Sequence, residues 1–219
     1  ERVGLLTDAA QAETLAQTLA RYRIRVDTEI EADPRPLYTR VGPESPPVEG
    51  WSDDGELEAG IPLAGNVRSV TTAEPDLPRV GLQAWTAVRV EAGEPLMGVD
   101  IDEDTIPQES GLVPQAVDFT KGCFLGQELV ARIDSRGGQT PRRLMGLIVT
   151  ETVIPPGGAE VVAGDRAVGT FSSPAESLVL RAPVGLGMLR REVEEGDVVT
   201  IRWDGGEAKA AVAELPLVG

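Results

Sequence analysis

Residues 157–171 read GGAEVVAGDRAVGTF, which is two short apolar runs with a turn between them. The runs cover residues 159–162 and 167–171, and Ala163-Gly164-Asp165 separates them. Short apolar runs bounded by Gly- and Asp-rich turns are typical of antiparallel strands. The stretch therefore predicts a pair of short strands.

The same pattern continues from Arg142 to the C-terminus. The other apolar runs cover residues 144–149, 178–181, 182–188, 198–203 and 208–213. Short strands at close, even spacing predict a small antiparallel barrel. The change in pattern falls just before Arg142, so we expect a barrel domain over residues 139–219 and an α+β portion over residues 1–138.

Upstream of the barrel, hydrophobic periodicity predicts a mixture of helices and strands. The expected elements are a strand end at 3–6, a helix from Thr7 or Asp8 to Tyr22, strands at 24–30 and 37–41, and a helix at 82–92 that ends at Gly93. Residues 42–66 are rich in Pro, Gly and acidic side chains and read as a loop. The chain does not begin with Met, and the order strand–helix–strand predicts a chain cut within a domain.

Composition excludes several classes of function. The chain has no histidine and a single cysteine, Cys123, so a Ser-His-Asp relay, a histidine zinc site and an intrachain disulfide are all ruled out. Its formal net charge of −16 argues against direct nucleic-acid binding, which needs a basic face. No apolar run is long enough to span a bilayer, and no signal-peptide pattern opens the chain. We therefore expect a soluble cytoplasmic protein with no membrane partner.

The acidic run at residues 100–104 invites comparison with a calcium-binding loop. Thr105 stands where the sharp turn of such a loop requires glycine, and Gly111 stands where it requires a bidentate glutamate. The run is therefore expected to be a solvated loop, and no metal site is predicted.

Residues 121–128 read KGCFLGQE and place Cys123 between two glycines. A short helix is expected over 127–133, which puts Cys123 near a helix N-terminus and two residues from the ammonium of Lys121. Both features stabilise a thiolate. A cysteine buried as a small hydrophobic side chain fits the residues equally well.

With these residues the chain resembles the YgfZ-type folate-binding proteins of the aminomethyltransferase (glycine-cleavage T-protein) superfamily. Residues 121–128 are similar to the signature K-G-C-[FY]-x-G-Q-E at every defined position. Upstream, residues 89–93 (RVEAG), Gly98, Asp100 and residues 107–109 (PQE) resemble the stretch R-[IV]-E-A-G…G-x-D…P-x-E that precedes the signature. Residues 142–147 are similar to the strand that enters the superfamily's C-terminal barrel.

The resemblance implies a fold and a site. The fold is α+β, with ferredoxin-like α/β lobes around folate, an N-terminal part missing, a middle lobe abbreviated, and a small C-terminal antiparallel β-barrel. The family's pterin-binding glutamate falls on Glu91, whose carboxylate can accept paired hydrogen bonds from the pterin ring. Cys123 and Lys121 would carry any chemistry, and Lys121, Gln127 and Glu128 would join Glu91 in binding tetrahydrofolate or a derivative. Arg89 is expected to be a structural ion-pair partner.

The function implied by the resemblance is that of a folate-dependent accessory factor in iron–sulfur cluster assembly or repair. Its partners would be iron–sulfur client proteins or cluster carriers, some of them enzymes that modify tRNA. One alternative is a tetrahydrofolate-dependent aminomethyltransferase, although such transferases do not carry the cysteine signature. The other is a folate-binding scaffold without catalysis, in which Cys123 is structural. The signature favours the accessory factor over the transferase.

Overall fold

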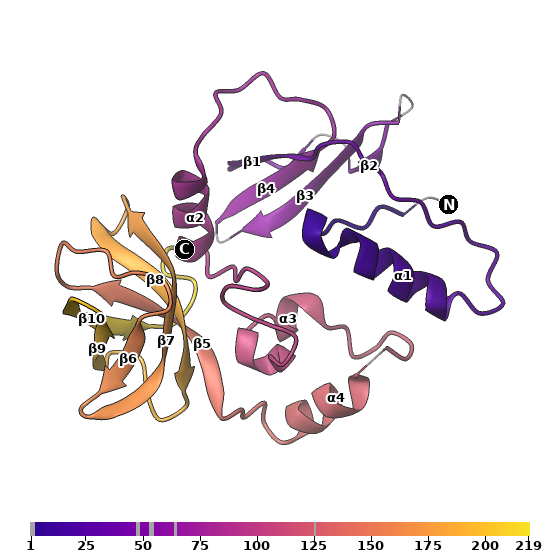
Figure 1. Cartoon of the computed structure of the whole chain (residues 1–219). Coiled ribbons are helices and arrows are strands. Elements are labelled where there is room, and N and C mark those ends of the chain that lie inside the picture. The colour runs from indigo at the N-terminus through magenta and orange to yellow at the C-terminus, as the bar shows by residue number, and fades with distance from the viewer. Residues whose placement is uncertain (1–2, 47–48, 53–54, 64, 125) are drawn as a thin grey trace. The chain divides into compact units, whose positions relative to one another are not determined.

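The computed structural model of the chain describes residues 3–46, 49–52, 55–63, 65–124 and 126–219 (Figure 1). Its elements in chain order are η1 (Ala9–Gln11), α1 (Ala12–Tyr22), β1 (Tyr38–Gly42), β2 (Gly50–Trp51), β3 (Leu57–Leu63), β4 (Asn66–Thr71), α2 (Leu82–Glu91), η2 (Pro107–Ser110), α3 (Val113–Ala116), α4 (Gln127–Ser135), β5 (Arg142–Val149), β6 (Glu160–Ala163), β7 (Arg166–Ser177), β8 (Ala182–Arg190), β9 (Val198–Trp203) and β10 (Gly206–Ala213). They divide into two compact units, Glu1–Leu77 and Pro78–Gly219. This division lies upstream of the boundary expected between residues 138 and 139, which stays a prediction.

The first unit contains a four-stranded antiparallel sheet in the order β1-β4-β3-β2. The loop expected over residues 42–66 is wrong, because β2, β3 and the start of β4 lie there, although residues 47–48, 53–54 and 64 are outside the described part. Proline and glycine suggested a loop, but β3 has a hydrogen-bonded neighbour on each side and buries Leu57 and Leu63. Tertiary pairing here overrides local composition.

The strands expected over residues 3–6 and 24–30 do not form. Residues 24–30 alternate apolar and polar side chains, but a strand also needs a partner, and Ile24 and Val26 remain 70% and 58% exposed. Helix α1 forms close to its expected position, after the short 3-10 turn η1, and β1 follows the strand expected over 37–41.

The second unit ends in a closed antiparallel barrel with the strand order β10-β5-β8-β7-β6-β9 (Figure 1). The expected α+β class with a small C-terminal barrel is therefore confirmed. Alternate side chains of the strands fill the interior, where Leu147, Phe171, Leu189 and Ile201 are fully buried. Closure pairs every strand on both edges, so the barrel exposes no strand edge.

Two glycines of β8 make room for this interior. A Cβ atom on Gly185 would lie 2.3 Å from Cε2 of Phe171, and one on Gly187 would lie 2.9 Å from Cδ1 of Leu147. The Gly185-Leu186-Gly187 triplet thus follows the period-two alternation of a barrel strand, with Leu186 on the opposite face. The ring of Phe171 fits only because Gly185 has no side chain on this face of β8.

The helix expected over residues 82–92 forms as α2, and Gly93 follows it with a φ of 73°. Helix α2 packs on β7 and β8. Val90 is fully buried and packs with Val184 and Leu186 in a second apolar cluster, outside the barrel interior. The C-terminus lies beside α2 (Figure 1), and Leu215 and Leu217 join the same cluster.

The strand expected over residues 178–181 is a turn between β7 and β8. Leu178 and Val179 are 81% and 64% exposed, and Arg181 has a φ of 55°. Their apolar character suggested a strand, but β7 and β8 pair with each other up to Ser177 and Ala182, and a hairpin has to turn between those residues. Among the residues described, no helix has the length and apolar character to cross a membrane.

Candidate functional site

Glu91 is the last residue of α2, and β7 and the C-terminal tail hold it in place. Its carboxylate oxygen Oε1 accepts a hydrogen bond of 2.6 Å from the hydroxyl of Ser177, the last residue of β7. Its backbone carbonyl accepts hydrogen bonds from the N–H groups of Leu217 and Val218, at 2.8 and 3.1 Å. The side chain is half-buried, and within the described residues Oε2 accepts no hydrogen bond. Glu91 therefore keeps one carboxylate oxygen available to a ligand.

Arg89 lies two residues before Glu91 on α2 and fixes the helix to β7. Its guanidinium forms a buried ion pair with Asp100, at 2.8 Å, and also donates to the hydroxyl of Ser173. Asp100 in turn accepts hydrogen bonds of 2.6 Å from the hydroxyls of Ser172 and Ser173 on β7. The structural ion-pair role expected for Arg89 is what the geometry shows.

Asp100 was expected to be solvated with the rest of the acidic run, and this expectation is wrong. Its side chain is fully buried and satisfied by Arg89, two serine hydroxyls and the N–H of Leu96. Asp102 and Asp104 are exposed, as expected of a solvated loop. No local pattern pointed to the two serine partners of Asp100, because they lie more than 70 residues away on β7.

Three of the predicted site residues meet at a small pocket beside α4. The pocket has a volume of about 240 Å³ and is lined by Phe119, Lys121, Phe124, Gln127, Glu128 and Ala131. The ammonium Nζ of Lys121 lies 5.3 Å from the ring centroid of Phe124, a cation–π distance. Gln127 Oε1 accepts a hydrogen bond of 3.1 Å from the N–H of Phe124 and so fixes the entry to the helix. We call this the phenylalanine pocket.

Cys123 carries a free, exposed thiol. The alternative of a cysteine buried as a small hydrophobic side chain is therefore wrong. The helix expected at 127–133 is confirmed as α4, with Gly126 as its N-cap residue at a φ of 81°. Cys123 precedes that cap by three residues. Leu125 of the signature lies outside the described residues.

The structure thus places the predicted site residues in two groups. Lys121, Gln127 and Glu128 line the phenylalanine pocket, whereas Cys123 and Glu91 are not among its described lining residues. Glu91 belongs instead to the junction of α2, β7 and the C-terminal tail. Ser177 was missed at the sequence level, because it lies 86 residues from Glu91 and no local pattern links the two.

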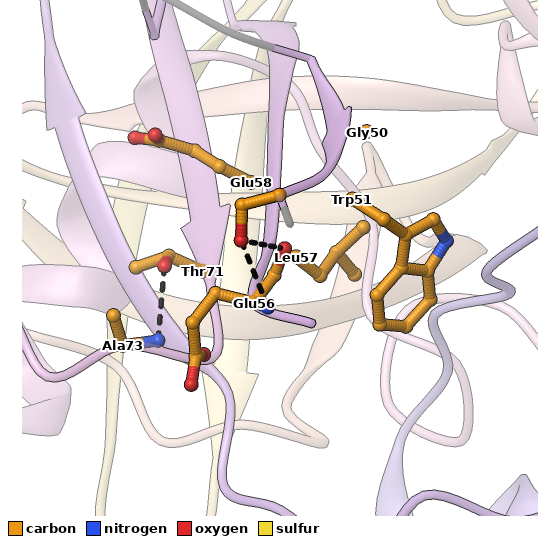
Figure 2. Close-up of a pocket in the computed structure, with 8 residues that line it drawn as sticks. Gly50, Trp51, Glu56, Leu57, Glu58, Thr71 and Ala73 are labelled. Carbon is orange, nitrogen blue, oxygen red and sulfur yellow. Dashed lines mark hydrogen bonds between the residues drawn. The ribbon is translucent and has the colours of Figure 1, made fainter. Parts of the chain in front are cut away.

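A second hollow lies in the first unit and involves none of the predicted site residues. It has a volume of about 470 Å³, and Figure 2 shows Trp51 on one side of it with Thr71 and Ala73 on the other. Its acidic side chains are engaged locally: Glu58 accepts a hydrogen bond of 2.9 Å from Arg40, and Glu56 accepts one from Thr72. Both carboxylates are thus held by neighbouring side chains of the same unit, and we assign no ligand to this hollow.

The barrel has a recognised counterpart among protein families. Residues 142–218 match the family model of the glycine cleavage T-protein C-terminal barrel domain. The fold of the chain also resembles the crystal structure of glycine cleavage system aminomethyltransferase T from Bartonella henselae, with a TM-score of 0.64 and 22% sequence identity. That match covers 74% of this chain and 50% of the solved chain, and at this identity it bears on the fold alone.

Curated relatives extend the similarity beyond the barrel. The chain is 35% identical over 136 residues to an aminomethyltransferase from Pseudothermotoga lettingae, a match that covers 62% of this chain and 36% of the relative. It is 37% identical over 142 residues to an aminomethyltransferase from Frankia alni, covering 64% of this chain and 38% of the relative. The chain therefore spans little more than a third of the length of these relatives.

Residues 142–218 are thus similar to the barrel domain of the glycine cleavage T-protein, and the relatives that match a longer part of the chain are named aminomethyltransferase. These names favour the transferase alternative over the iron–sulfur accessory function that the signature implied. Assignment to the YgfZ-type proteins rests on residues 121–128 and stays a prediction.

Proposed function

We propose that the chain binds tetrahydrofolate, or a derivative of it, at Glu91, and takes part in folate-dependent aminomethyl transfer. The observation that carries the proposal is the state of the Glu91 carboxylate. It is half-buried at the end of a helix, and one oxygen is held while the other accepts no hydrogen bond from the described residues. The relatives' printed name supports the transfer reaction, and the placement of Glu91 supports the ligand.

A carboxylate in this setting suits the pterin ring. The ring presents an N–H and an exocyclic amine side by side, and a carboxylate can accept both in one plane. An ionised carboxylate has about four lone-pair sites, and Ser177 occupies one of them. Enough acceptor capacity therefore remains at Glu91 for paired hydrogen bonds to a ligand.

Calorimetry on this chain tests the proposal. A stable formyl derivative of tetrahydrofolate is titrated into the wild type, into Glu91→Ala and into a matched control, Glu176→Ala, which removes an exposed glutamate from β7. Loss of a charge-assisted contact costs about 1.5–3 kcal/mol, so Glu91→Ala should bind roughly tenfold or more weakly, and the control should match the wild type. Equal affinity of Glu91→Ala and the wild type would remove Glu91 from the site.

A second candidate function is favoured by one observation, the exposed thiol of Cys123. An accessible cysteine, directly before Phe124 of the phenylalanine pocket in sequence, is what a folate-dependent accessory factor for iron–sulfur proteins would require. In that case Lys121, Gln127 and Glu128 would shape the surroundings of the thiol, and client proteins would approach it there.

The two candidates differ in how Cys123→Ser behaves. Serine is close to cysteine in size, and the position is exposed, so folding and folate binding should stay the same. The transferase proposal predicts methylene transfer to tetrahydrofolate with unchanged rate in the serine variant. The accessory proposal predicts no transfer by the wild type, and loss of iron–sulfur enzyme activity when the variant replaces the wild type in cells.

A further inference from the structure

Ser177 occupies a position built for a single hydrogen bond to Glu91. It is fully buried at the end of β7 and pairs with Ala182 on β8, so its backbone is held by the sheet. The N–H of Leu180 donates to its hydroxyl oxygen at 2.9 Å. A serine hydroxyl has one proton to donate, and the neighbouring carboxylate at 2.6 Å can only accept. The hydroxyl proton is therefore directed at Oε1 of Glu91.

A glutamate side chain without such a contact samples several rotamers, and ordering it costs free energy when a ligand binds. Holding Oε1 restricts the rotation of the carboxylate, and with it the directions in which Oε2 can point. The donor stands on a barrel strand rather than on a free loop, which gives the orientation a rigid reference.

We propose that Ser177 is a positioning residue for the ligand-binding carboxylate: it holds Glu91 in the orientation that receives the pterin ring. The inference rests on the proposed function, because it assigns Ser177 a role at the same site. Ser177 does not touch the ligand; it acts through Glu91.

A double-mutant cycle on this chain tests the inference. The affinity for the formyl derivative of tetrahydrofolate is measured by calorimetry for the wild type, Ser177→Ala, Glu91→Ala and the double variant. Ser177→Ala should weaken binding about tenfold, as expected for loss of one hydrogen bond to a charged group. In the Glu91→Ala background the same substitution should have no further effect, because the residue through which Ser177 acts is already gone.

Two controls separate positioning from a general structural effect. Thr170→Ala removes another hydroxyl of β7, at an exposed position outside the Asp100 network, and should bind like the wild type. Binding of para-aminobenzoylglutamate, the part of folate that lacks the pterin, should be the same in the wild type and in Ser177→Ala. Thermal melting verifies that each variant is folded.

The outcomes are distinct. An equal loss from Ser177→Ala with and without Glu91 would overturn the positioning role while leaving the proposed function in place. Unchanged affinity in Ser177→Ala would do the same. No binding of the formyl derivative by the wild type would overturn both the proposed function and this inference.

Discussion

Arg89 brings a charge into a buried position, and its partners explain how the chain tolerates it. The side chains of Arg89 and Asp100 are 5% and 0% exposed, and both serine hydroxyls beside them are on β7. The network therefore ties α2, which ends in Glu91, to the barrel. A buried ion pair adds little net stability by itself, but breaking one is costly because a lone charge remains.

Arg89→Ala should therefore lower the free energy of unfolding by about 3–5 kcal/mol, since Asp100 would stay buried without its cation. Urea unfolding followed by circular dichroism measures this. Arg190→Ala, at an exposed position on β8, is the matched control and should change stability by no more than about 0.5 kcal/mol. If both variants unfold at the same urea concentration, the Asp100 network does not anchor α2.

Asp118, just before the signature, provides a pH-dependent probe of the local turn. Its carboxylate accepts hydrogen bonds of 2.7 Å from both the hydroxyl and the N–H of Thr120, and these lower the pKa of Asp118, the hydroxyl contributing most. A lowered pKa in the folded state means that the turn is stabilised above the unfolded-state pKa and loses that contribution as the pH falls through the folded-state value.

The amide shift of Thr120, followed against pH, should therefore titrate at a lower midpoint in the chain than in a short unstructured peptide of the same sequence. Thr120→Val removes the hydroxyl donor and should move the midpoint back towards that of the peptide. Identical midpoints in peptide and chain would show that this turn does not form in solution.

At the scale of elements, the glycines of β8 are a packing requirement of the barrel. Gly185→Ala places a methyl group 2.3 Å from the ring of Phe171, which is fully buried and cannot move without displacing its neighbours. Overpacking of this kind costs about 1–3 kcal/mol. Thermal unfolding should show the loss for Gly185→Ala and none for Gly157→Ala, whose Cβ would meet Pro174 at an ordinary 3.4 Å. Equal melting temperatures would mean that Phe171 does not fill the barrel interior.

The elements that the sequence predicted well are those whose pattern is local. The barrel strands are short apolar runs separated by turn residues, and α4 carries apolar side chains on one side, so both were predictable from a few neighbouring residues. The strand β3 was not, because its stability comes from pairing with β2 and β4 rather than from its own Gly- and Pro-containing sequence.

The same distinction between local and long-range information applies to the residues of the candidate site. The grouping of Lys121, Gln127 and Glu128 follows from their closeness in sequence and from the helix that begins at Gln127. The contact between Glu91 and Ser177 joins residues that are 86 positions apart, and no local pattern reports such a pair. The resemblance to a family singled out Glu91 but contained no information about what holds it.

At the scale of the whole chain, the barrel should fold by itself but should need α2 for its full stability. Residues 142–219 contain all six strands of the closed barrel and the leucines of the C-terminal tail. They lack Val90, which is fully buried against the outer face of the barrel and contributes about 1.5–3 kcal/mol through burial of its side chain.

The fragment 142–219 should accordingly give a dispersed amide spectrum, and the fragment 78–219 should unfold at a higher urea concentration. A collapsed spectrum for residues 142–219 would show that the barrel is not an independent folding unit. Equal stability of the two fragments would show that α2 does not cover the barrel.

Folate binding at Glu91 can be checked by mapping the ligand on the chain. An NMR titration of the isotope-labelled chain with the formyl derivative of tetrahydrofolate reports which amide groups sense the ligand. The largest shifts should fall on Glu91 and Ala92, on the turn that follows Ser177, and on Leu217 and Val218, whose N–H groups bond to the Glu91 carbonyl. Shifts confined to the hollow around Trp51 or to the phenylalanine pocket, with the end of α2 unaffected, would contradict it.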